Sequence, residues 1–424
     1  VSTQSTGIRK MSKILNIAVR AIYDGRGIPT TEVEVQTTCG LYRASAPTQQ
    51  SFSRLDCVEL RDGDKNWSGR GVQKCIDQIR QKLRQPLSGL DVAQFGEIDK
   101  KIKELDESTD SRMSTIGTNA SLPLSMACFQ AAAAYFRSPL YKFFAANANI
   151  KPKLPTLAIS VVSGGLSSGP SAIKEYCIIS KGDLNTQLTN YFTLVAEAKK
   201  QLKTFAISQS GGFVLETEGM EDTLKVIQGW IKGAGLDGKI QLILDCAAND
   251  FFDQKEYKYE PSKFGSGKQK LLLSGAQMLE KYAAWAPLFN IAALVDPYYY
   301  EDFGNYADII AKNKKITIIG CQQMNSTATR VQYMIKHERG QLANQVGLQF
   351  TSTGLVSEVI KAAKKGVELG VQLSMFSGIG EQEDAFISHA AVGFGCEYFF
   401  TGGLMKGERM EKVNEIIRIA SVMK

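Results

Sequence analysis

The second part of the sequence alternates short apolar segments with longer amphipathic ones, and this alternation restricts the fold more than any other feature. The apolar segments have the length of β-strands and lie at 240–247, 291–296, 316–320, 346–350, 371–376 and 398–401. Amphipathic segments of helical length accompany most of them, for example at 223–231 and 356–369. Repeated strand–helix units build a parallel sheet. The number of units, in a chain of 424 residues, favours a closed β/α barrel over an open sheet.

The first part of the chain, before about residue 150, has a different organisation. Apolar and alternating segments at 14–23, 31–36 and 41–44 are separated by turn residues and indicate an antiparallel meander of three strands. Helical patterns follow at 71–85 and 119–136, and the second of them contains a run of alanines. Strands followed by helices are typical of an α+β domain.

These patterns divide the chain into three parts within an overall α/β fold class. We expect a polar extension over residues 1–10, an α+β domain over 11–145 and a β/α barrel over 146–424. The hydrophobic fraction of 44% is enough for a large core, and the charged fraction of 22% argues against a mostly disordered chain.

Charge, hydropathy and cysteine usage exclude several classes of protein. The net charge of +7 is mild for this length, and no segment has the spacing of a nucleic-acid-binding motif, so we expect no nucleic-acid partner. No apolar run reaches the roughly 18 residues that cross a bilayer, so we expect neither a signal peptide nor membrane association. Eight scattered cysteines without a Cys-x-x-Cys pair indicate reduced, packed thiols and a cytoplasmic location.

Five short motifs occur in order along the chain. They are Asp-Gly-Arg-Gly-Ile-Pro-Thr at 24–30, Glu-Leu-Arg-Asp-Gly-Asp-Lys at 59–65, Asp-Cys-Ala-Ala-Asn-Asp-Phe at 245–251, Asp-Pro at 296–297 and Gly-Glu-Arg at 407–409. In order and spacing they resemble motifs of the enolase (phosphopyruvate hydratase) family, from about Met11 to the C-terminus. The resemblance implies an N-terminal α+β domain that caps an atypical β/α barrel, with the site at the C-terminal face of the barrel.

The resemblance also implies a Mg²⁺ site made of three carboxylates at successive strand ends. Asp245 matches the first of them, but the second position is Val295 and the third is Gln322. Mg²⁺ requires anionic oxygens in a nearly octahedral array. Valine has no oxygen to offer and glutamine offers a neutral one, so we expect the metal to be lost and no cofactor to be bound. Asp296 is adjacent, but alternation along a strand is expected to turn it to the opposite face.

The other functional positions implied by the resemblance also hold uncharged residues. In the segment 208–213, Ser210 stands where the family has its acid/base Glu. The remaining replacements are Gln349 for the Lys that abstracts a proton, Ser167 for a loop His, Phe376 for the Arg that grips substrate phosphate, and Phe400 for a substrate-contacting Lys. Ser51 and Glu175 are remnants of substrate-contacting positions. Neither a serine hydroxyl nor a glutamine amide exchanges protons near neutral pH, so no catalytic group is expected to be intact.

Three readings of this altered site are distinguished by its structure. Phe376, Phe400 and Val295 are expected to point inward and form an apolar plug, which would favour a scaffold protein. An open apolar pocket would instead favour a protein that binds a different small ligand. A Lys, Glu or Asp that reaches the barrel mouth from an unexpected strand would favour an enolase with residual activity.

We therefore expect an enolase-fold pseudoenzyme that is retained as a structural protein of a larger assembly. Enolases of the family are homodimers and are found recruited into cytoskeletal and ciliary assemblies, and the resemblance extends both expectations to this chain. Protein partners in a cytoskeletal or axonemal complex are thus expected, with the cilium or flagellum as the alternative to the cytoplasm.

Overall fold

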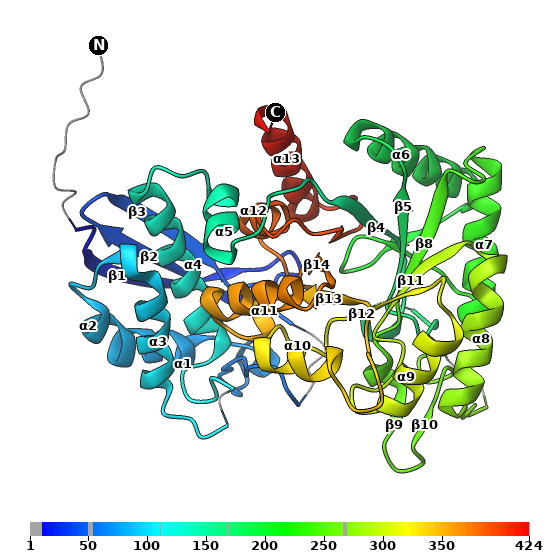
Figure 1. Cartoon of the computed structure of the whole chain (residues 1–424), viewed down its shortest axis with the longest axis horizontal. Helices are drawn as coiled ribbons and strands as arrows, with labels where there is room; N and C mark the ends of the chain where they lie inside the picture. The colour runs from blue at the N-terminus through cyan, green and yellow to red at the C-terminus, as the bar shows by residue number, and fades with distance from the viewer. Residues whose placement is uncertain (1–10, 50–53, 111, 168, 266–268, 424) are drawn as a thin grey trace.

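The computed structural model divides into two parts that lie side by side, a smaller one built from the first third of the chain and a barrel built from the rest (Figure 1). The residues that the structure describes are 11–49, 54–110, 112–167, 169–265 and 269–423. The expected extension over 1–10 and the expected remnant Ser51 lie outside the described residues.

The first part contains the expected antiparallel meander. Strand β1 (Ile14–Tyr23) pairs with β2 (Pro29–Thr37), which pairs in turn with β3 (Gly40–Ser45). The helices that follow are α1 (Gln73–Gln78), α2 (Arg84–Leu87), α3 (Phe95–Asp106), α4 (Thr118–Tyr135) and α5 (Leu140–Ala148). Helix α4 is apolar on nearly all sides and is buried almost throughout, as expected for a helix with no polar face.

The second part is a closed barrel of eight strands, in the order β4, β5, β8, β11, β12, β13, β14 and β15, with β15 paired to β4. Their bounds are Thr156–Ser163, Glu175–Ser180, Ile240–Asp245, Ile291–Val295, Thr317–Gly320, Gln345–Leu348, Gln372–Phe376 and Tyr398–Gly402. All six strands expected after residue 240 are present. Strands β4 and β5 were missed, and β5 runs antiparallel to both of its neighbours, so the barrel is not wholly parallel.

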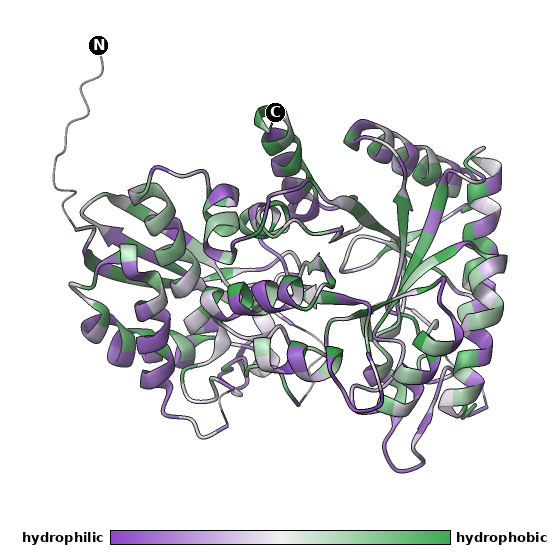
Figure 2. Cartoon of the chain, viewed as in Figure 1, coloured by the Kyte–Doolittle hydropathy of each residue, from purple (hydrophilic) through white to green (hydrophobic). Residues whose placement is uncertain are grey.

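Helices surround the barrel strands. They are α6 (Leu184–Gln201), α7 (Met220–Gly233), α8 (Gly275–Leu288), α9 (Phe303–Lys312), α10 (Ala328–Ile335), α11 (Val356–Glu368), α12 (Phe386–Gly393) and α13 (Gly407–Val422). The outer helices carry hydrophilic residues on one side, whereas the strands that they cover are mostly hydrophobic (Figure 2). Of the helices in the described part of the chain, none combines the length and apolar character that a membrane crossing requires.

The segment between β3 and α1 joins the first part to the C-terminal ends of the barrel strands. The backbone of Thr48 exchanges two hydrogen bonds with Gly380, in the loop after β14. The N–H of Cys57 donates to the carbonyl of Ser352, in the loop after β13. The first part therefore lies against the face of the barrel at which the functional positions are expected.

Candidate functional site

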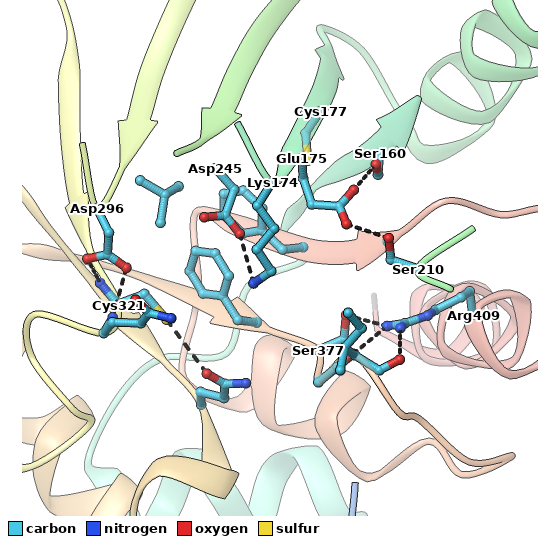
Figure 3. A pocket seen from close by; sticks show the side chains of 18 residues that line it. Ser160, Lys174, Glu175, Cys177, Ser210, Asp245, Asp296, Cys321, Ser377 and Arg409 are labelled. Carbon is cyan, nitrogen blue, oxygen red and sulfur yellow. Dashed lines mark hydrogen bonds and ion pairs between the residues drawn. The ribbon is translucent and has the colours of Figure 1, made fainter. Parts of the chain in front are cut away.

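The expected site is a small cavity at the barrel mouth, lined by the C-terminal ends of the barrel strands (Figure 3). Its volume is about 60 Å³. A water molecule needs roughly 10–15 Å³ of such space, so the cavity holds only a few waters. Sites for small-molecule ligands usually measure about 300–1,000 Å³. The mouth is therefore nearly filled by its own side chains.

One half of the mouth is apolar. The rings of Phe376 and Phe400 stack with centroids 4.0 Å apart and an angle of 9° between their planes. They occupy paired positions on β14 and β15, and they are buried in one cluster with Val295 and Cys321. The expected inward plug is thus present. Burial of each ring stabilises the fold by about 1.5–3 kcal/mol.

The mouth also carries charged side chains, and one of them, Lys174, could not be placed there from the sequence. The ammonium of Lys174 lies 3.3 Å from Oδ2 of Asp245, the one carboxylate retained from the expected metal site (Figure 3). Lys174 directly precedes β5. Because β5 is antiparallel to its neighbours, its N-terminal end lies at the same edge as the C-terminal ends of β4 and β8.

The charge state of Lys174 follows from its surroundings. Burial alone would lower the pKa of its ammonium, but the negative charges of Asp245 and Asp250 outweigh this effect, and the pKa is raised. Lys174 is therefore held as a cation. A lysine that abstracts protons near neutral pH needs the opposite shift.

Asp296 corrects one expectation, because it lines the same cavity as Val295 and does not point to the opposite face. Strand β11 ends at Val295, and Asp296 has a backbone φ of 41°, so the alternation of the strand stops before it. Its carboxylate accepts hydrogen bonds from the backbone N–H groups of residues 321, 322 and 323 at 3.0, 2.8 and 3.3 Å. Burial raises its pKa to about 7 despite these donors.

At the remaining positions of the expected metal site, the side chains either lack an oxygen or already have a partner within the chain. Val295 contributes only apolar surface, and Oε1 of Gln322 accepts a hydrogen bond of 2.7 Å from Asn249. Asp296 is bound to backbone donors and Asp245 to an ammonium. Within the described ranges, no three His, Cys, Asp or Glu side chains come together as a group that could hold a metal ion. The donor set therefore does not fit the hard, octahedral coordination of Mg²⁺.

Glu175, a substrate-position remnant in the sequence analysis, lies in a cluster of serines. Its carboxylate accepts hydrogen bonds from the hydroxyls of Ser160, Ser163 and Ser210, the last of these standing at the expected acid/base position. Burial raises the pKa of Glu175, and the hydroxyls of Ser160 and Ser210 partly offset this rise. The chain of hydroxyls continues to Ser208, whose Oγ lies 3.1 Å from that of Ser210. The serine cluster therefore holds the carboxylate of Glu175, and the expected acid/base position at Ser210 contributes a hydroxyl and not a second carboxylate.

Replacing Ser160 with Ala should destabilise the protein by about 1–3 kcal/mol, because the buried carboxylate of Glu175 would lose a donor. The folded-state pKa of Glu175 lies above its ordinary value of 4.5, so the folded protein binds more protons than the unfolded chain and stability falls as pH rises from there. The substitution should raise this pKa further, because the hydrogen bond from Ser160 lowers it, and should extend the fall of stability to higher pH. Urea unfolding at several pH values measures both effects. Ser421→Ala on the exposed end of α13 is the control and should change stability by less than about 0.5 kcal/mol; equal losses in both variants would contradict the prediction.

Arg409 is the second cation of the mouth, and its side chain is used to hold a loop. Its guanidinium donates to Oγ of Ser377 and to the carbonyls of Gly378 and Ile379 at 2.9, 2.8 and 2.7 Å. The residue is 1% exposed. In the sequence this arginine is marked only as part of the motif at 407–409. Its contacts fix the loop that follows β14, next to Phe376.

Two further positions implied by the resemblance are Gln349 and Ser167. Gln349 lines the cavity, and its backbone N–H donates to Oγ of Ser326 at 2.8 Å. Ser167 ends a short 3-10 helix (Gly165–Ser167), and its side chain is outside the described part of the structure. Of the eight cysteines, all are free thiols and only Cys39 is exposed, as expected for packed thiols.

Comparison with known proteins gives matches over nearly the whole chain. Residues 14–144 match the family model described as the enolase N-terminal domain, and residues 151–423 match the model described as the enolase C-terminal TIM barrel domain. An enolase of Mastigamoeba balamuthi is 33% identical over 427 residues, which cover 96% of this chain and 95% of the relative. An enolase of Eimeria tenella and enolase 1 of Entamoeba histolytica are each 29% identical, over 96% of this chain and 96% and 95% of the relatives.

Proposed function

The chain belongs to the enolase family, and we propose that it is a member without phosphopyruvate hydratase activity that serves as a scaffold in a larger protein assembly. One observation carries the loss of activity. The barrel mouth, where the chemistry of the family would take place, holds a stacked pair of phenylalanines and an ion pair between Lys174 and Asp245. Neither arrangement can bind Mg²⁺ and abstract a carbon-bound proton.

The scaffold role is supported by what the chain keeps. The barrel is closed, the core is continuous and the first domain is joined to the barrel mouth by backbone hydrogen bonds. A nearly filled mouth also disfavours a ligand-binding role, because about 60 Å³ is far below the volume of ordinary ligand sites. We propose a cytoplasmic location, with a ciliary or flagellar axoneme as the alternative, and a homodimer by analogy with the family.

One observation favours residual enolase activity as a second candidate. Lys174 reaches the mouth from the start of β5, where the sequence predicted no functional group. However, its ammonium is paired with Asp245 and its pKa is raised, so it stays protonated and has no free electron pair with which to abstract a proton. The scaffold proposal is therefore preferred.

Affinity capture with mass spectrometry tests the scaffold proposal. The whole chain is used as bait in extracts of its own organism, and the enolase of Mastigamoeba balamuthi, which shares its fold, is the matched control bait. We expect a stable set of partners, cytoskeletal or axonemal in kind, with this chain and not with the control. The same partners on both baits, or none above background, would contradict the proposal.

A further inference from the structure

The ion pair between Lys174 and Asp245 explains more than the absence of activity. We propose that Lys174 is a built-in counter-ion, which takes the position of a divalent cation at Asp245 and keeps metal out of the barrel mouth. The inference concerns the same site and rests on the proposed loss of the metal-dependent reaction. It assigns a role to a residue that no motif of the sequence pointed to.

The backbone holds Lys174 in place. Glu175 lies opposite Asp245 in the antiparallel pairing of β5 and β8, and the backbone N–H of Lys174 donates to the carbonyl of Asp245 at 3.0 Å. The side chain thus starts beside the carboxylate that it contacts. Its ammonium lies 3.3 Å from Oδ2, with 29% of the side chain exposed, compared with 9% for Asp245. Because the side chain of Lys174 is partly exposed, the contact is within reach of solvent.

The other two carboxylates of the mouth, and the amide oxygen of Gln322, already have donors within the chain. Asp296 accepts hydrogen bonds from three backbone N–H groups, and Glu175 accepts hydrogen bonds from three serine hydroxyls. The side-chain oxygen of Gln322 accepts a hydrogen bond from the amide of Asn249. Among these groups, Asp245 is the one whose partner is a charged, partly exposed side chain. Removal of that ammonium would therefore expose one carboxylate oxygen to solvent cations while the rest of the mouth stays bonded.

Charge balance explains why such a counter-ion would be retained. Asp245, Glu175 and Asp296 all line a cavity of about 60 Å³, and carboxylates that share a site repel one another when ionised. A divalent cation would relieve that repulsion as well, with Asp245 as its carboxylate ligand and water molecules as the others. An ammonium needs a single carboxylate as its acceptor. It also repels a second cation from the same oxygen, so the two cannot occupy Asp245 together.

The test measures whether the whole protein binds Mn²⁺, added as its chloride. Binding is measured by calorimetry, and stabilisation is measured by thermal unfolding. The unaltered protein should show no binding and no stabilisation at millimolar Mn²⁺. Lys174→Met should bind Mn²⁺ with a dissociation constant in the millimolar range. When the free Mn²⁺ concentration is about ten times that dissociation constant, the ratio of folded to unfolded protein should rise about elevenfold. Lys174→Arg keeps the cation and should remain without binding.

Two controls separate this effect from a change in net charge or in folding. Lys153→Met removes a lysine that pairs with Glu397 at 2.6 Å on a different part of the barrel, and it should not create Mn²⁺ binding. Lys174→Met combined with Asp245→Asn should abolish the binding that Lys174→Met creates. Lys174→Gln is measured in parallel, because it also removes the charge but keeps a polar group at this position.

The outcomes are decisive in each direction. Mn²⁺ binding by the unaltered protein, or none by folded Lys174→Met and Lys174→Gln, overturns the inference. If neither variant folds with or without Mn²⁺, the lysine is structural only, and the inference is again overturned. The proposed loss of enolase activity is tested separately, by an activity assay of the unaltered protein. If the counter-ion role of Lys174 is overturned but the unaltered protein has no enolase activity, the proposed function is not affected.

Discussion

Purified protein given 2-phosphoglycerate and saturating Mg²⁺ should form no measurable phosphoenolpyruvate. The positions that the family resemblance assigns to the base and the acid/base partner hold Gln349 and Ser210, and Asp245 is occupied by Lys174. Each tenfold loss in rate corresponds to about 1.4 kcal/mol of transition-state stabilisation, and loss of the metal or the base costs several times that. The absorbance of phosphoenolpyruvate measures the reaction, with the Mastigamoeba balamuthi enolase as positive control.

A single restoring substitution should not recover the activity. Gln349→Lys would place a base at the expected position, but Phe376 and Phe400 would still fill the space beside it. Catalytic groups that act as a unit are strongly non-additive, so one of them alone gives little rate. Turnover by the unaltered protein within a hundredfold of the control enolase would contradict the proposed loss of function.

Phe376→Arg should destabilise the protein by about 3–5 kcal/mol, the second large effect that we expect. The ring is 7% exposed and stacks on Phe400, and Arg409 already lies in the same mouth. An added guanidinium would be buried without a carboxylate of its own and near another cation. The urea midpoint and the melting temperature measure the loss.

Two further substitutions serve as controls for this prediction. Phe376→Leu keeps an apolar side chain and should cost less, because only part of the ring contact is lost. Phe192→Arg places the same charge on α6 at a ring that is 45% exposed, and it should change stability by less than about 0.5 kcal/mol. A melting temperature of Phe376→Arg equal to that of the unaltered protein would show that the plug contributes nothing to stability.

Much of the fold could be predicted because most barrel strands carry their own signal. The strands after residue 240 are apolar runs that are buried on both faces and accompanied by helices. Strands β4 and β5 are as apolar, but the segment that joins them has no α-helix and includes only the short 3-10 helix Gly165–Ser167. The pattern that identified the other strands was therefore missing. The short link is also what allows β5 to run antiparallel, since parallel neighbours need a long crossover.

The sequence was sufficient to place those site residues that lie at the C-terminal ends of parallel strands. It was not sufficient where a residue's place depends on the direction of its strand or on a break in the strand. Phe376, Phe400 and Val295 could be placed together because each lies at the C-terminal end of a parallel strand. Lys174 precedes a strand, and only the reversed direction of β5 brings it to the mouth. Asp296 was misplaced because its positive φ ends the alternation of β11. Both errors come from backbone geometry that residue types alone do not specify.

The pairing of β15 with β4 has a consequence for how the protein is made. The two strands that close the barrel lie at Thr156–Ser163 and Tyr398–Gly402, so the edge of β4 is synthesised long before its partner. At a translation rate of roughly 5–20 residues per second, the delay is about 10–50 s. Nascent chains that carry the first domain and an open barrel would expose an unpaired strand edge during that time. Chaperones that bind such edges should therefore associate with ribosomes translating this message until β15 has left the exit tunnel.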